Sequence, residues 1–252
     1  TDNGGNYVAW NWKANGSGSS NTDGSINTTK TSANVDAGFS IVSYTGTNTN
    51  GATIGHGLSS TPEMLIVKAR SAGGENWRVY HSGIASDAET DCIDLNLTNA
   101  AADGDSIWND TAPTSSVFSV GQDGGVNADG TTYVAYCFHS VDGYSKVGSY
   151  TGNGNADGAF IYTGFRPAFV IIKPSSRGGH WFMANNKSSP FNVVDKVIFA
   201  NATAAEYTDP NADCKKDFLA NGFKIYTTDD NTNENGATYI YLAFAETPFK
   251  YS

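Results

Sequence analysis

The sequence contains one unit of about 105 residues twice, and this internal repeat constrains the fold more than any single motif. The segment GFSIVSYTG at residues 38–46 returns as GYSKVGSYTG at residues 143–152. Four further pairs follow in the same order: residues 62–68 with 167–173, 73–77 with 178–181, 96–100 with 201–205, and 133–138 with 239–244. Because the offset is the length of a whole domain, the pattern predicts two tandem domains related by internal duplication, each large enough for its own core.

The repeat also predicts where the domains begin and end. We expect the first unit at residues 36–141 and the second at residues 142–252. The segment YVAWNW at residues 7–12 reads like the last strand of either unit, so residues 1–13 are expected to be the final strand of a preceding, truncated unit. Residues 14–35 are rich in Gly, Ser, Asn and Thr, which is typical of a linker, but a segment of this length could also lie across a neighbouring subunit.

Apolar residues alternate with a period of two along both units, and helical periodicity is almost absent. Residues 64–67 and 169–172 are continuous apolar runs that each follow a proline, which is typical of central strands. We expect about seven strands per unit; in the first they lie near residues 40–44, 63–68, 77–81, 92–97, 106–109, 117–120 and 133–138. The predicted fold is all-β, with two tandem antiparallel β-sandwich domains of jelly-roll-like form.

Charge and cysteine content exclude several classes of protein. The formal net charge of −10 argues against a nucleic-acid partner, because binding to phosphates needs a basic surface. No apolar run is long enough to span a bilayer, so membrane insertion is not expected. The cysteines, Cys92, Cys137 and Cys214, form no CxxC pair and no closed disulfide set, and we expect them to be small buried hydrophobes.

The chain offers little of the chemistry that catalysis needs. Its four histidines are scattered, and neither an HExxH nor a GxSxG motif is present. The candidate acids and bases recur at no equivalent place in the other unit: Glu63, Glu75, Glu89, Asp91, Glu206, Asp213 and Asp217. We therefore predict a protein that is not an enzyme, with no catalytic residues, cofactor or metal. The acidic loops at residues 123–129 and 229–234 are expected to be hairpin turns, with calcium binding left open.

The candidate ligand-binding residues lie near the two Gly-Gly pairs. Trp77 and Trp181 occupy matching positions, and Arg78, Arg177 and His180 stand beside them. Aromatic rings next to Gly-rich loops can stack on the apolar faces of sugars. A tryptophan that recurs on a strand in both copies is more often a core residue, so the core interpretation is favoured and the ligand platform stays as the alternative.

Several segments resemble a tandem β-domain found in predicted tail-fibre and other virion proteins of marine bacteriophages. The resemblance rests on residues 7–13, 108–118, 165–173, 192–196, 221–224 and 239–251. It implies a location on the outside of a virion, and it carries over no activity and no catalytic residues.

Three hypotheses follow. The first is a non-enzymatic virion surface protein, a tail-fibre or receptor-binding module that contacts host surface glycans, with other virion proteins as partners and a homo-oligomeric state that is trimeric in a fibre. The second is a capsid-decorating or architectural module without a ligand. The third is a polysaccharide depolymerase with a carboxylate pair in a groove.

Overall fold

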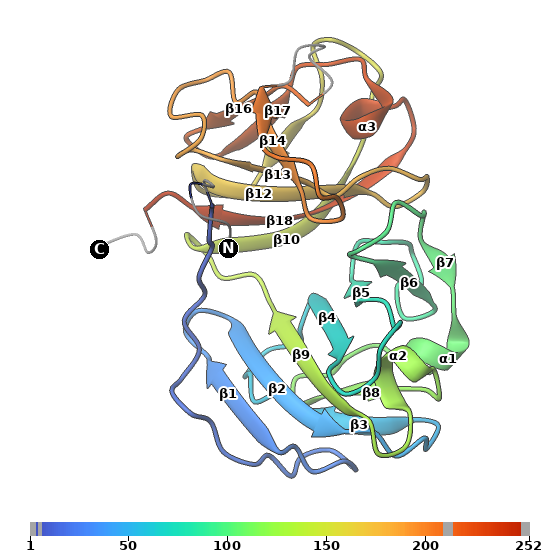
Figure 1. Cartoon of the computed structure of the whole chain (residues 1–252). Coiled ribbons are helices and arrows are strands. Elements are labelled where there is room, and N and C mark those ends of the chain that lie inside the picture. Colours follow the sequence, from blue (N-terminus) through green and yellow to red (C-terminus); the bar gives the residue numbers. More distant parts are fainter. Residues whose placement is uncertain (1–3, 5–6, 209–213, 248–252) are drawn as a thin grey trace.

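The computed structural model describes residues 4, 7–208 and 214–247, and almost all of its regular structure is β (Figure 1). The only helices in this part of the chain are three single turns of four residues each. Every pair of neighbouring strands is antiparallel. The all-β class and the antiparallel sandwich expected from the sequence are therefore confirmed.

The first unit consists of one large sheet and one small sheet packed face to face. The large sheet has the order β1-β2-β9-β4-β5-β6-β7, and the small sheet pairs β3 with β8. The elements are β1 (Lys30–Asn34), β2 (Phe39–Thr45), β3 (Ala52–Gly55), β4 (Met64–Ala69), β5 (Arg78–His81), β6 (Asp91–Asp94), β7 (Ala102–Asp103), α1 (Asp105–Trp108), β8 (Val117–Val120), α2 (Gly124–Asn127) and β9 (Thr132–Phe138).

The second unit has the same construction. Its large sheet has the order β10-β18-β12-β13-β14-β15, and its small sheet the order β11-β17-β16. The elements are β10 (Ser145–Thr151), β11 (Phe160–Tyr162), β12 (Pro167–Pro174), β13 (Phe182–Asn185), β14 (Lys196–Phe199), β15 (Tyr207–Thr208), β16 (Lys216–Leu219), β17 (Gly222–Ile225), α3 (Asp230–Asn233) and β18 (Thr238–Ala245).

The two units share strand order and also individual contacts. The Asn127 amide accepts a hydrogen bond from Thr47 N at 2.9 Å, and the equivalent Asn233 accepts one from Asn153 N at 3.0 Å. Both asparagines are fully buried, and each donates two or more hydrogen bonds to the loops that surround it. Such a match is what an internal duplication would produce, although common origin itself stays a prediction.

The period-two pattern places two different hydrophobic cores on the two faces of the large sheet in the second unit. On β18, one face belongs to the core inside the second unit and the opposite face to a core shared with the first unit. The inward residues are Tyr239, Tyr241 and Ala243, and the residues that face the first unit are Ile240, Leu242 and Phe244. The large sheets thus pack against each other, with β10, β18 and β12 on the side of the second unit nearest the first (Figure 1). The second unit therefore has a core of its own, whereas the core of the first unit continues into the contact with the second.

The sequence predicted the last strand of a preceding unit at residues 1–13. Residues 7–13 contain no strand, and residues 1–3, 5 and 6 lie outside the described residues. Instead Trp10 and Trp12 insert between the two large sheets, with ring centroids 5.2 Å from Phe169 and 5.5 Å from Phe244 respectively. We call this contact between the large sheets, including both tryptophans, the seam. The expectation of a strand failed because the two indoles gain more by filling the seam than the backbone would by pairing at a sheet edge.

The expected linker at residues 14–35 is partly ordered into the first sandwich. Its last part forms β1, which extends the large sheet, and Ile26 forms a parallel bridge with Ile54 of β3. The strand expected at residues 106–109 is instead the helical turn α1. The acidic loops also contain helical turns, α2 and α3. The carboxylate of Asp123 accepts a hydrogen bond from Gly125 N in α2, and that of Asp229 accepts one from Asn231 N in α3.

Candidate functional site

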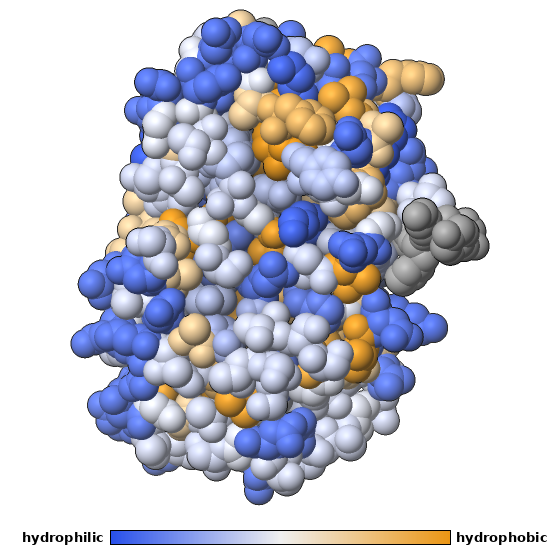
Figure 2. Space-filling view, turned by 180° about the vertical axis from the view of Figure 1, so that it is seen from behind, coloured by the Kyte–Doolittle hydropathy of each residue, from blue (hydrophilic) through white to orange (hydrophobic). Residues whose placement is uncertain are grey.

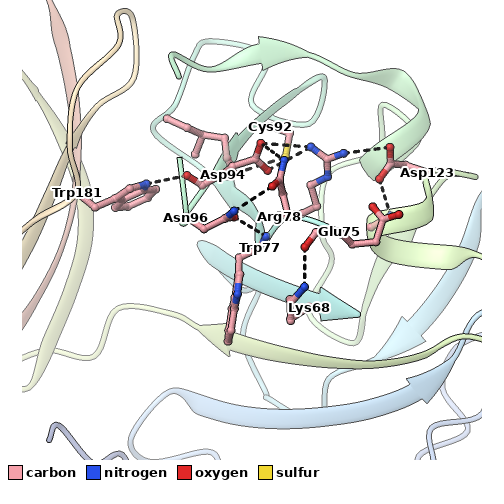
Figure 3. Close-up of polar contacts among 12 residues, drawn as sticks. Lys68, Glu75, Trp77, Arg78, Cys92, Asp94, Asn96, Asp123 and Trp181 are labelled. Atoms are coloured by element: carbon pink, nitrogen blue, oxygen red, sulfur yellow. Dashed lines mark hydrogen bonds and ion pairs between the residues drawn. The ribbon is translucent and has the colours of Figure 1, made fainter. Parts of the chain in front are cut away.

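The five residues that the sequence singled out do not form one open surface. Trp77 and Arg78 lie at the start of β5, and Arg177, His180 and Trp181 lie between β12 and β13. Figure 3 shows the first group together with Trp181, whose indole reaches toward β6 from the other unit. Each of the five makes contacts within the protein.

Arg78 is held between two carboxylates (Figure 3). Its guanidinium lies 3.2 Å from Asp94 Oδ1 and 3.3 Å from Asp123 Oδ2. Burial lowers the pKa of Arg78, but Asp123 and Asp94 together raise it above its ordinary value. Since Asp123 also caps α2, this cluster fixes the acidic loop to β5 and β6. Its geometry serves internal support rather than capture of an external anion.

The two matched tryptophans have the same backbone contact but different surroundings. Trp77 N donates to Asn96 Oδ1 at 2.9 Å, and Trp181 N donates to Asn201 Oδ1 at the same distance. Trp181 is 1% exposed, and its Nε1 donates across the seam to the Asp94 carbonyl at 2.9 Å. Trp181 is therefore a core residue, the second of the two interpretations, and no sugar can reach its ring. Trp77 is half-buried.

Arg177 and His180 take part in separate contacts near the surface of the second unit. Arg177 Nε lies 3.0 Å from Glu234 Oε2, beside the acidic loop that contains α3. The His180 ring stacks on Phe199 with centroids 4.4 Å apart, and its Nδ1 lies 3.1 Å from Asn201 Nδ2. These side chains therefore brace the loops of the second unit.

Trp77 lines a cavity of about 460 Å³ within the seam. Its walls come from both large sheets and from residues 10–12, and almost all of them are apolar. The principal lining side chains are Trp10, Trp12, Trp77, Tyr136, Phe169 and Leu242. Since its lining residues include no carboxylate, histidine, lysine or arginine, this cavity is suited to apolar packing and not to acid–base chemistry.

The structure also shows an exposed aromatic face that the sequence analysis did not single out. The side chains of Phe160 and Tyr162 are open to solvent on β11, as are Phe191 and Val193 near β16. Figure 2 shows hydrophobic side chains at the surface of the upper half of the molecule, which is the second unit. The signal was present, because two aromatic residues at alternate positions on a short strand must point to the same side.

Other groups have structural roles. Cys92, Cys137 and Cys214 are buried as expected, and burial raises the pKa of Cys92 and Cys137 to about 12. Across the described ranges, no three His, Cys, Asp or Glu residues come together as metal ligands. Within the same ranges, no helix is long and apolar enough to cross a membrane.

These features define an all-β protein of two sandwich units joined by an aromatic seam. Residues 1–248 match the family described as a domain of unknown function, DUF7483, and the chain belongs to that family. Comparison with curated proteins finds no match, and neither does comparison with solved structures.

Proposed function

We propose that the chain is a non-enzymatic surface module of a virion, in which the two sandwich units act as one rigid building block of a tail fibre or another appendage. The observation that carries the proposal is the seam, because its hydrophobic core runs without interruption from β4 and β9 into β12 and β18. The resemblance of the sequence to virion proteins supports a location on the virion.

Polar contacts reinforce the seam. The fully buried Lys173 of β12 donates from Nζ to the Asn99 carbonyl of the first unit at 2.8 Å. His81 Nε2 lies 3.2 Å from the Tyr241 carbonyl, and Ala101 N donates to the Ser175 carbonyl at 2.8 Å. A hinge between domains requires a small and polar contact, whereas these interactions surround an apolar core. The two units of the module therefore move together as one rigid body.

This proposal departs from the first hypothesis in where a ligand could bind. Trp181 and Arg78 make internal contacts, so we do not propose the two Gly-Gly loops as a glycan site. The architectural hypothesis is thereby favoured over glycan recognition at these five residues.

The test is cryo-electron microscopy of the particle that carries the chain. We expect copies at the outer surface with the two units in the relative orientation of Figure 1. Absence of the chain from purified particles, or units separated at the seam in the assembly, would overturn the proposal.

A further inference from the structure

The cavity in the seam is bounded by the opposed faces of the two large sheets. Alternate residues of a strand point to the same face, and the lining follows this spacing on β2, β4, β9 and β12. The pairs are Phe39 with Ile41, Met64 with Ile66, Tyr136 with Phe138, and Phe169 with Ile171. Met183 of β13 and Leu242 of β18 extend the wall on the side of the second unit. A molecule in this cavity would therefore touch both units.

Residues 10–12 form a further wall that is held by side chains. The Trp10 ring packs against Phe169, and the Trp12 ring packs against Phe244. Residues 8–13 form no backbone–backbone hydrogen bond with another described residue. This wall can therefore shift to admit a ligand without breaking any pairing of the sheets.

Several apolar side chains around the cavity lack full contact with the protein. Ile41, Ile66, Leu95 and Met183 are only half-buried, although they line a space between two sheets. Water against such side chains finds few hydrogen-bond partners, so an apolar molecule that displaces it gains free energy. The lining thus favours occupation of the cavity by an apolar ligand.

The lining also determines the chemical class of that ligand. A charged group inside the cavity would be desolvated without a counter-ion, because no ionisable acid, histidine, lysine or arginine lines it. Nearly half of the lining residues are aromatic, and Met64 and Met183 add polarizable sulfur atoms. Aromatic rings and thioethers both pack favourably against a flat ring system. An uncharged aromatic molecule is therefore the best match.

The size and position of the cavity exclude a polypeptide partner. An α-helix with its side chains is about 10–12 Å across, so a space of about 460 Å³ holds roughly one turn. An added strand would need an unpaired sheet edge, whereas sheet faces line this cavity. The same volume is about three times the ~150 Å³ apolar cavity that takes up benzene.

We propose that the cavity in the seam binds an uncharged aromatic molecule of about two or three fused rings. The sheet faces hold its rings, and residues 10–12 close over it. Such a ligand binds only where both units are folded and in contact, so it stabilises the seam. The inference is independent of the proposed location on a virion.

The experiment is a titration of the full chain with naphthalene, followed by nuclear magnetic resonance of the methionine methyl groups. The chain has two methionines, and both line the cavity. Ring currents of bound naphthalene should shift the signals of Met64 and Met183 along one common saturation curve. The probe should also raise the midpoint of thermal unfolding, because it binds the folded state.

A second probe tests the chemical class of the ligand. At pH 7, 2-naphthoate carries the same ring system with an ionised carboxylate. It should bind at least about tenfold more weakly than naphthalene, because the cavity offers no cation.

A space-filling variant tests the location of the site. Ala200 lines the cavity but is exposed, so Ala200→Trp can place an indole in the cavity without disturbing the core. This variant should lose affinity for naphthalene at least about tenfold, because the added ring occupies the space of the ligand. Ala205→Trp is the matched control, since Ala205 is exposed and does not line the cavity.

Three results would each overturn the proposal: methionine signals that do not respond to naphthalene, equal affinity for 2-naphthoate, or undiminished binding by Ala200→Trp. None of them bears on whether the chain lies on a virion, which the microscopy decides separately.

Discussion

Acid should loosen the seam through His81, and the effect can be calculated from its surroundings. The imidazole is 1% exposed at the end of β5. Its Nδ1 accepts from Gly83 N at 3.0 Å, so Nε2 carries the proton and donates to the Tyr241 carbonyl of the second unit. Burial lowers the pKa of His81 to about 4, because a charged ring would be desolvated there and Nδ1 would lose its donor.

The unfolded chain takes up this proton below about pH 6.5, but the folded chain does so only near pH 4. Between these values the unfolded state binds more protons, so the free energy of unfolding falls as the pH falls. From pH 7 to pH 4 the loss from His81 alone is about 3 kcal/mol. Denaturant titrations at a series of pH values should therefore show a shallower pH dependence in His81→Gln, by about that amount.

The glutamine amide can still donate toward the Tyr241 carbonyl, and it does not titrate. His180→Gln is the control, because His180 stacks on Phe199 away from the Tyr241 contact. Carboxylates contribute to acid unfolding in all three proteins, so only the difference between the curves is informative. If His81→Gln and the native chain lose stability in parallel from pH 7 to pH 4, the neutral buried imidazole does not make the seam sensitive to acid.

Three further predictions test individual contacts by denaturant or thermal unfolding. Trp181→Phe should cost about 1–3 kcal/mol because it removes the buried hydrogen bond from the indole to the Asp94 carbonyl, whereas the half-buried Trp77→Phe should cost less; equal losses would contradict the different roles of the two indoles. Asn127→Ala and Asn233→Ala should each lower the free energy of unfolding by a similar amount, about 2–4 kcal/mol, because their buried hydrogen bonds match. A neutral effect at either site would show that this asparagine does not anchor its loop. Trp12→Ala should cost about 2–3 kcal/mol and open the seam to hydrophobic dyes, and unchanged dye binding would show that the indole does not close it.

The sequence predicted the sandwich and its sheets well where the information was local and repeated. Period-two alternation in residues 133–138 and 239–244 identified β9 and β18 and required both faces to be covered. The alternation could not show what covers the face of β9 and β18 that points away from the core of its own unit. That depended on how the two units pack against each other, and on residues 10–12 being drawn into the seam.

The candidate site was predicted less well, because position on a strand does not reveal the contacts of a side chain. Trp77 and Trp181 match in sequence and in backbone hydrogen bonding, yet only Trp181 is buried across the seam. The asymmetry arises because the two units pack through different neighbours. The alternating pair Phe160 and Tyr162 was visible in the sequence, but its exposure depends on how the rest of the chain packs, which the strand alone does not show.

The most direct measurement of the central claim is differential scanning calorimetry of the whole chain. Since the hydrophobic core of the seam is continuous with that of the first unit, we expect a single transition whose calorimetric and van't Hoff enthalpies agree. Two resolved transitions, or a calorimetric enthalpy near twice the van't Hoff value, would show that the units unfold independently and that the seam does not join them into one body.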